Sequence, residues 1–289
     1  MIYCSMIRMF DGWFVERKTF AFGAMYAGNG AAGASIPYIM AAAFEKLGYR
    51  KAIVAWAVVD AVILCSFAYW QKPRVRVKGQ DLLSFAFLWS PRFYIPFVCT
   101  IVQGIGFFLP AIYLPQFTGY AFPDTNEAYR NGTLTAMNAA NILGCLVMGY
   151  LGKSIHPYNL FLIASAGSAV SVFWLFGFAL QPGLLYAFAV TYGFFAGSWS
   201  VNWAGAIVDL QKHLKGQRTD TGIIYGLFLF ARGLGSIVSG PLSSALIGKS
   251  LSKGLTIYAT PYGSVVTVTG VTAAVGGLCF LAKFVKVRG

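Results

Sequence analysis

The sequence predicts an all-α polytopic membrane protein with about eight transmembrane helices. Two observations carry this prediction. Apolar stretches that reach the roughly 20 residues needed to cross a bilayer follow one another along the whole chain. The composition is 57% hydrophobic and only 11% charged, whereas soluble domains are about 25% charged. A chain of this kind belongs in a membrane, and the observations argue against a soluble enzyme.

The expected spans cover residues 19–43, 51–70, 93–116, 134–151, 160–180, 184–208, 221–247 and 263–281. Charged residues bound them in a regular order. Alternate gaps, beginning before the first span, carry Arg8, Arg17 and Lys18, then Lys72, Arg74, Arg76, Lys78 and Arg92, then Lys153, then Lys212, Lys215 and Arg218, and finally Lys283, Lys286 and Arg288. The gaps between these carry Lys46, Arg50 and Lys51, then Arg130, then no basic residue, then Lys249 and Lys253.

This alternation predicts the topology. The first set of gaps holds 15 basic residues, the second holds 6, and Arg232 inside a span completes the 22. Because basic residues collect on the cytoplasmic side, both termini are expected there. The most polar gap, 71–91, is then a basic cytoplasmic linker, either a solvated connection or one that touches anionic lipid. We expect the plasma membrane rather than an organellar one.

Several functional classes find little support in the sequence. The net charge of +13 is spread over helix ends and short loops, which fits membrane topology better than nucleic-acid binding. The five cysteines lie in apolar stretches without metal-ligand spacing, and no metal site or cofactor is predicted. The segment 28–33 fits the dinucleotide-binding pattern GxGxxG, but it lies inside an apolar span and not after a strand. We interpret its glycines as helix-packing positions.

The segment 13–28, WFVERKTFAFGAMYAG, places a cationic collar before a helix with small residues on its packing face. It resembles a signature of the monocarboxylate-porter branch of the major facilitator superfamily, and departs from it at Glu16, Phe20 and Met25. The matching residues are Phe14, Arg17, Lys18, Ala21, Gly23, Ala27 and Gly28. Weaker resemblances to fungal members lie at 232–241, 138–144 and 149–153.

The resemblance implies a major-facilitator-type helical bundle and a particular register. In that family the signature leads into the fifth of twelve helices, so this chain would hold helices five to twelve and lack the first four. Residues 1–70 would then be the remnant of the N-terminal bundle, with 1–10 left from its fourth helix, 71–91 the linker, and 92–289 the C-terminal six-helix bundle.

Polar residues inside spans are costly in a bilayer and are therefore functional candidates. Asp60 is either a proton relay or a carboxylate paired with a neighbouring helix. Asn138 and Asn141 share one helix face, and they either line a polar cavity or bond helix to helix. For Gln103 and Asn202 packing is the preferred interpretation. Arg232 either binds an anionic solute or is paired or snorkelling.

Aromatic residues supply further candidates for the solute path. Phe194 and Trp199 on the sixth span, and Phe107 and Phe108 on the third, either stack on a planar solute or anchor the helices in lipid. The helix that carries an Asp and an Arg in carriers of lactate-like acids here has Asn138 and no arginine. This absence weakens a monocarboxylate assignment, and the resemblance extends to carriers of other solutes such as riboflavin.

The sequence therefore predicts secondary active transport of a small organic solute, a monocarboxylate, vitamin or similar, by alternating access. Proton coupling is implied by the resemblance alone. The expected partners are the lipid bilayer and a small-molecule solute, with no nucleic acid. The alternative is a truncated, non-transporting membrane remnant or an interaction protein. An enzyme is not expected, because no nucleophile–base or metal-ligand constellation is present in the sequence.

Overall fold

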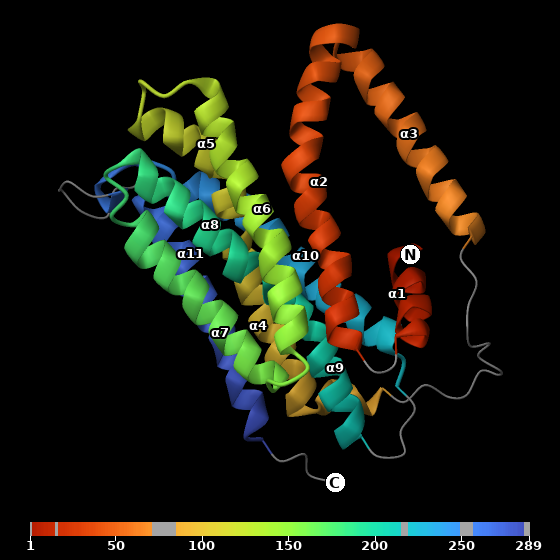
Figure 1. Ribbon diagram of the computed structural model, residues 1–289. Helices are drawn as coiled ribbons and strands as arrows, with labels where there is room; N and C mark the ends of the chain where they lie inside the picture. Colours follow the sequence, from red (N-terminus) through yellow and green to blue (C-terminus); the bar gives the residue numbers. More distant parts are fainter. Residues whose placement is uncertain (1, 15–16, 71–84, 215–218, 249–256, 286–289) are drawn as a thin grey trace.

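The computed structural model describes residues 2–14, 17–70, 85–214, 219–248 and 257–285, and these contain helices and no strand (Figure 1). The α-helices are α1 (Ile2–Trp13), α2 (Lys18–Leu47), α3 (Tyr49–Trp70), α4 (Pro91–Phe107), α5 (Leu109–Ala121), α6 (Glu127–Leu151), α7 (Pro157–Val170), α8 (Pro182–Ser198), α9 (Asn202–His213), α10 (Thr221–Leu246) and α11 (Gly263–Gly276). Short helical turns at Ala86–Trp89, Trp199–Val201 and Ile257–Ala259, a π-helical stretch at Ser171–Phe176 and a 3-10 stretch at Gly277–Lys283 complete them. The helical membrane fold expected from composition is confirmed.

Seven segments of the described chain are long and apolar enough to cross a membrane, against the eight expected. The segment that does not meet both conditions is α2, which corresponds to the predicted span 19–43. It has 30 residues, so its length suffices, but glycines, Asn29 and Pro37 lower its apolarity. A helix of this composition suits a position against other helices better than one in lipid.

Four of the expected spans are not continuous α-helices. Those at 160–180 and 263–281 pass from α7 into the π-helical stretch and from α11 into the 3-10 stretch. The span expected at 93–116 is two helices, α4 and α5, which meet at Phe108. Pro110 at the second position of α5 explains the break, because its ring nitrogen cannot donate a helical hydrogen bond. The span expected at 184–208 passes from α8 through the turn at Trp199–Val201 into α9, which extends to His213. Periodicity alone does not reveal such breaks.

The bundle is held together by two sets of helix pairs. α6 packs between α2 and α8, and α4 packs against both α10 and α11, while α7 covers α11 and α8. One apolar cluster surrounds Trp199, Trp203 and Phe228, and a second surrounds Phe117, Phe176 and Phe188. The rings of Phe176 and Phe188 stack with centroids 4.4 Å apart. Segments far apart in sequence, such as α2 and α6, thus lie side by side (Figure 1).

Glycines make the α2–α6 contact close. A Cβ atom placed on Gly23 would lie 2.5 Å from the carbonyl oxygen of Cys145, and one on Gly30 would lie 2.8 Å from that of Asn138. A Cβ on Gly33 would meet the Asn138 amide at 2.6 Å, whereas one on Gly28 would meet nothing within 4 Å. The GxGxxG segment therefore lies in mid-helix, and two of its three glycines serve packing.

The signature residues divide between packing and the helix start. Ala21 and Ala27 are buried, whereas Phe14 and Gly28 are exposed. Arg17 directly precedes α2. The Lys18 ammonium lies 2.8 Å from a carboxylate oxygen of Asp11 on α1, so the collar ties the two helices together. α1 itself packs against α10.

α3 differs from the other helices in its surroundings. It turns back after α2 at Gly48, whose φ of 74° suits glycine, and then diverges from the bundle (Figure 1). Of its 22 residues only Ala52 is buried, and large apolar side chains such as Val62 and Phe67 are exposed. Its apolar surface is therefore available to lipid or to other helices.

Some expected features lie outside the described residues. These are Glu16, the linker segment 71–84 with Lys72, Arg74, Arg76 and Lys78, and the basic residues Lys215, Arg218, Lys249, Lys253, Lys286 and Arg288. The side chain of Arg8 is likewise outside the description. The topology that these charges predict stays a prediction.

Candidate functional site

A cavity of about 510 Å³ lies between α2 and the helices that follow the linker. Its walls come from α2, the α4–α5 junction, α6, α8, the turn before α9, α9 and α10. The lining residues are Tyr26, Asn29, Phe107, Phe108, Ala111, Met137, Asn138, Asn141, Tyr192, Gly193, Gly197, Ser200, Trp203, Leu229 and Arg232. Asn138 and Arg232 are each the twelfth residue of helices with 25 and 26 residues. The cavity is thus at mid-depth, where carriers bind their solutes.

The two asparagines predicted on one face of α6 both line this cavity. The Asn138 amide nitrogen donates to the Leu134 carbonyl oxygen at 3.0 Å, one turn earlier on the same helix. The Asn141 Oδ1 accepts from the Cys145 thiol at 3.1 Å. Each side chain lies against a glycine of a neighbouring helix, Gly33 for the first and Gly197 for the second, and a methyl group on either glycine would displace the asparagine amide. The amides therefore combine helix contact with exposure to the cavity.

Arg232 turns into the bundle and does not snorkel towards a membrane surface. Its guanidinium carbon lies 3.8 Å above the ring of Phe107 and 5.6 Å from the ring of Trp203. Its Nη1 donates to the Ser200 hydroxyl. Its Nη2 is buried without a hydrogen-bond partner among the described residues. Within the described ranges no carboxylate lies at ion-pair distance from it, so the charge is balanced by aromatic faces and one hydroxyl.

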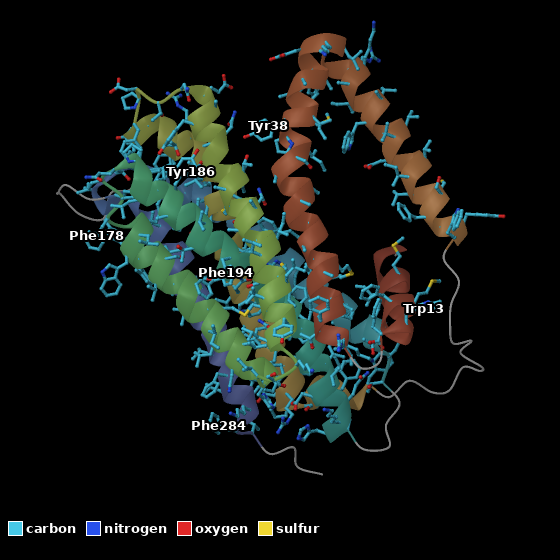
Figure 2. All side chains as sticks on the ribbon, in the orientation of Figure 1. Trp13, Tyr38, Phe178, Tyr186, Phe194 and Phe284 are labelled. Atoms are coloured by element: carbon cyan, nitrogen blue, oxygen red, sulfur yellow. The ribbon has the colours of Figure 1, made fainter. Side chains whose placement is uncertain are left out.

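Four other candidates lie outside the cavity lining. Gln103 and Asn202 are 4% and 0% exposed, and both carry buried amide atoms without a partner in the described part of the chain. Trp199 is a core residue whose indole nitrogen donates to the Ser165 hydroxyl at 3.0 Å. Phe194 packs against the same core from α8 (Figure 2). None of these four side chains is part of the cavity lining.

Asp60, the proton-coupling candidate, is not brought to the cavity. It lies on α3, is exposed, and is absent from the cavity lining. A helix partner for this carboxylate was one of the two expectations, but α3 contacts little of the bundle and buries only Ala52. The structure therefore separates Asp60 from the amides and Arg232.

Five polar or aromatic lining residues were not singled out from the sequence: Tyr26, Asn29, Tyr192, Ser200 and Trp203. Asn29 carried a usable signal, because it is an amide inside an apolar span. The aromatic residues carried none, since 17% of the chain is aromatic.

Two tyrosines join parts of the chain that are far apart. The Tyr225 hydroxyl on α10 donates to that of Tyr26 on α2 at 2.5 Å. The Tyr192 hydroxyl donates to the Phe107 carbonyl oxygen at 3.2 Å, at the α4–α5 break.

A charged cluster lies at the C-terminal end of α9, away from the cavity residue Trp203 at its start. The Asp209 carboxylate is 2.7 Å from Nη1 of Arg92 and 3.5 Å from Nε2 of His156, and the His213 ring is 3.8 Å away. Burial lowers the pKa of His156, against the opposing attraction of Asp209. A groove of about 640 Å³ adjoins this cluster. Because it lies at helix ends, we assign it to the support of α4, α7 and α9 and not to the solute path.

Tyr38 on α2 marks a further contact with α6. Its hydroxyl lies 2.8 Å from that of Thr135, and Figure 2 shows it on the side of α2 that faces α6. Together with Gly23 and Gly30, it extends the α2–α6 contact beyond the cavity. The segment before the linker therefore forms one wall of the site.

Comparison with known proteins agrees with this architecture. The family model described as Major Facilitator Superfamily matches residues 1–240. The chain is 25% identical to the aspyridones efflux protein apdF of Emericella nidulans, over 96% of the chain and 54% of that protein. It is 25% identical to the MFS-type transporter hasB of Aspergillus fumigatus, over 92% and 61%, and 24% identical to the fujikurins efflux protein of Gibberella fujikuroi, over 85% and 52%.

The chain thus spans a little over half the length of the relatives it matches. The matched residues include α2, α6 and most of α10, which form the cavity, so the site lies within the family match. The chain belongs to the Major Facilitator Superfamily.

Proposed function

We propose that the chain is the major part of a secondary transporter that moves a small organic solute across the membrane by alternating access. The observation that carries the proposal is the cavity of about 510 Å³ at mid-helix depth, walled by α2 on one side and by the later helices on the other. Its volume lies within the roughly 300–1,000 Å³ of pockets for drug-sized ligands. Two of the relatives are named as efflux proteins for organic compounds, so export is the proposed direction.

In the proposed register, α2 to α11 correspond to helices five to twelve of a twelve-helix carrier, and α1 belongs to helix four. The contact of α2 with α6 and the coverage of just over half of each relative support this register. The exposed apolar surface of α3 agrees with this register, because further helices would cover it in a complete carrier. We propose cytoplasmic termini and a plasma-membrane location. Successful cysteine labelling of the 71–91 segment from outside intact cells would contradict the proposed orientation.

A monocarboxylate of the lactate type is the less favoured solute. The described α6 has its single arginine, Arg130, in the first turn, where Nη2 donates to the Pro123 carbonyl oxygen at 3.1 Å. The cavity positions of α6 hold Met137, Asn138 and Asn141. Proton coupling stays with Asp60 as a candidate, and D60N tests it: loss of uptake driven by a pH gradient supports the role, and unchanged uptake rejects it.

Transport is tested by reconstituting the chain into liposomes and measuring uptake of a panel of labelled aromatic acids, vitamins and sugars. Ala111→Trp places an indole in the cavity lining and is expected to abolish uptake. Leu143→Trp is the matched control, because Leu143 is 61% exposed on α6 and outside the lining. Uptake no greater than in empty liposomes would favour the alternative, a non-transporting membrane remnant or interaction protein.

A further inference from the structure

We infer that the cavity binds a planar organic monoanion, with its negative charge at Arg232 and its ring system against the aromatic lining. This inference rests on the proposed function, because it names the solute class of the same cavity. It is carried by three features of the lining: one cation, a majority of aromatic over aliphatic side chains, and amides from two other helices.

The first feature is the charge. Arg232 is the single charged side chain of the cavity lining in the described chain. It lies at the middle of a 26-residue helix, where a charge is costly unless it is paired. Its Nη2 has no partner among the described residues, and no carboxylate of these residues is within ion-pair distance. A solute with one negative charge supplies the missing partner.

The position of the cation is fixed by its surroundings. A Cβ on Gly104 of α4 would lie 2.9 Å from the Arg232 carbonyl oxygen, so the two helices cross closely at this residue. Ser200 accepts one N–H of the guanidinium, and the Phe107 ring covers one of its faces at 3.8 Å. The remaining N–H groups are held in place without a carboxylate. A preset guanidinium of this kind favours a planar, delocalised anion, which it can bind with two parallel hydrogen bonds.

The second feature is the shape of the apolar surface. Rings from Tyr26, Phe107, Phe108, Tyr192 and Trp203 line the cavity, against few aliphatic side chains. The Phe107 and Phe108 rings meet at 84° with centroids 4.7 Å apart, and both line the cavity. Aromatic pairs of this geometry favour flat ring systems over saturated ones.

The third feature is polar and comes from helices other than that of Arg232. Asn29 on α2 and Asn138 and Asn141 on α6 offer amide groups to the cavity. Amides both donate and accept hydrogen bonds, so they suit carbonyl or hydroxyl groups of the solute. The lining thus describes a flat molecule that carries one acidic group and neutral polar groups.

The test measures binding and not transport. The purified chain in detergent is titrated calorimetrically with 2-naphthoate, its neutral isostere 2-naphthamide, and the saturated decahydro-2-naphthoate. We expect 2-naphthoate to bind about tenfold or more tightly than each of the other two, since a charge-assisted hydrogen bond is lost in one and ring stacking in the other. Equal binding of naphthoate and naphthamide would overturn the charge assignment, and equal binding of the saturated acid would overturn the planar one.

A pair of variants locates the anion. Arg232→Gln is expected to weaken 2-naphthoate binding about 10- to 100-fold, the loss of one charged hydrogen-bonding group, and to weaken 2-naphthamide binding by a smaller factor. Arg232→Lys should recover part of the loss. Arg130→Gln is the control. Arg130 lies in the first turn of α6, where it donates to the Pro123 carbonyl oxygen, and it is outside the cavity lining. Wild-type binding by a folded Arg232→Gln variant would refute the site, and the probe comparison in the wild-type chain does not depend on any variant folding.

The outcomes separate the two proposals. If naphthoate binds with the expected preference but liposomes show no uptake, the anion site stands and transport by this chain fails. If neutral and saturated solutes are taken up and bound as well as naphthoate, transport stands and the anion site is rejected.

Discussion

Two glycines of the α2 signature, five residues apart, provide a sharp test of how this helix is held. Gly23 lies where α2 crosses α6: a Cβ on it would be 2.5 Å from the Cys145 carbonyl oxygen and 3.1 Å from the Cα of Gly149. Gly28 lies on the same helix with nothing within 4 Å. The substitutions Gly23→Ala and Gly28→Ala add the same methyl group to the same helix, so any difference between them reports on the crossing.

The magnitude follows from the distances. An ordinary Cβ contact begins at 3.4 Å, and the difference from 2.5 Å means that α2 and α6 must separate by 0.9 Å at Gly23. Both obstructing atoms belong to the backbone of α6, so no side chain can rotate away. Overpacking of this kind costs about 1–3 kcal/mol. At Gly28 the methyl group meets open space, and alanine gains up to about 1 kcal/mol over glycine in a helix.

The assay is thermal unfolding of each variant in detergent, followed by the loss of the monodisperse peak in size-exclusion chromatography. Gly23→Ala should melt below the wild-type chain, and Gly28→Ala at or above it, with a separation of about 2 kcal/mol between them. Equal melting of the two variants would refute the close α2–α6 crossing. A lower melting temperature for Gly28→Ala alone would show that the tight contact lies on the Gly28 face of α2 and not on the Gly23 face.

Three further predictions concern polar contacts. Asp209→Asn leaves the Arg92 guanidinium, whose side chain is 10% exposed, without its carboxylate at 2.7 Å. The free energy of unfolding in detergent should fall by about 3 kcal/mol. An unchanged melting curve would contradict the pairing of Arg92 with Asp209. Because burial lowers the pKa of His156 below 6.5, the unfolded chain binds the proton more readily, and stability should fall as pH drops through 6.5 towards the folded pKa. Melting scans across this window should show the fall, and His156→Gln should lack that part of it. Tyr26→Phe removes the 2.5 Å hydrogen bond with Tyr225 at a cost of about 1 kcal/mol. The double variant Tyr26→Phe/Tyr225→Phe should lose less stability than the sum of the two single losses, and fully additive losses would argue against the bond.

Much of the fold was predictable because its determinants are local. Length and apolarity along the chain predict the helices, and the seven candidate spans coincide with seven of the eight expected. Pro110 indicated in the sequence that this span could be interrupted, but it did not indicate that the helices meet at Phe108. Whether a proline bends or divides a helix depends on the groups that satisfy the freed carbonyls, and here Tyr192, far away in sequence, donates to that of Phe107.

The site was predictable to a lesser degree. The spacing of Asn138 and Asn141 fixed their common helix face, and both line the cavity. Gln103 and Asn202 were equally polar in sequence, yet they are buried outside the cavity lining. The difference is set by which helix packs on which face, a property of pairs such as α2 and α6 that no local pattern contains. The same holds for Asp60. Its position near the middle of an expected span made it a reasonable candidate, but it lies on α3, which does not line the cavity.

The length of α2 relates the molecule to the thickness of its bilayer. With 30 residues and a rise of 1.5 Å each, the helix is about 45 Å long. That exceeds the roughly 30 Å of hydrocarbon and equals the full distance of about 45 Å between the outer edges of the two headgroup layers. Lys18 and Lys46 stand near its two ends. If α2 lies along the membrane normal, a helix of this length brings both ammonium groups to the depth of the lipid headgroups, and a thinner membrane would require α2, and the cavity wall that it forms, to tilt.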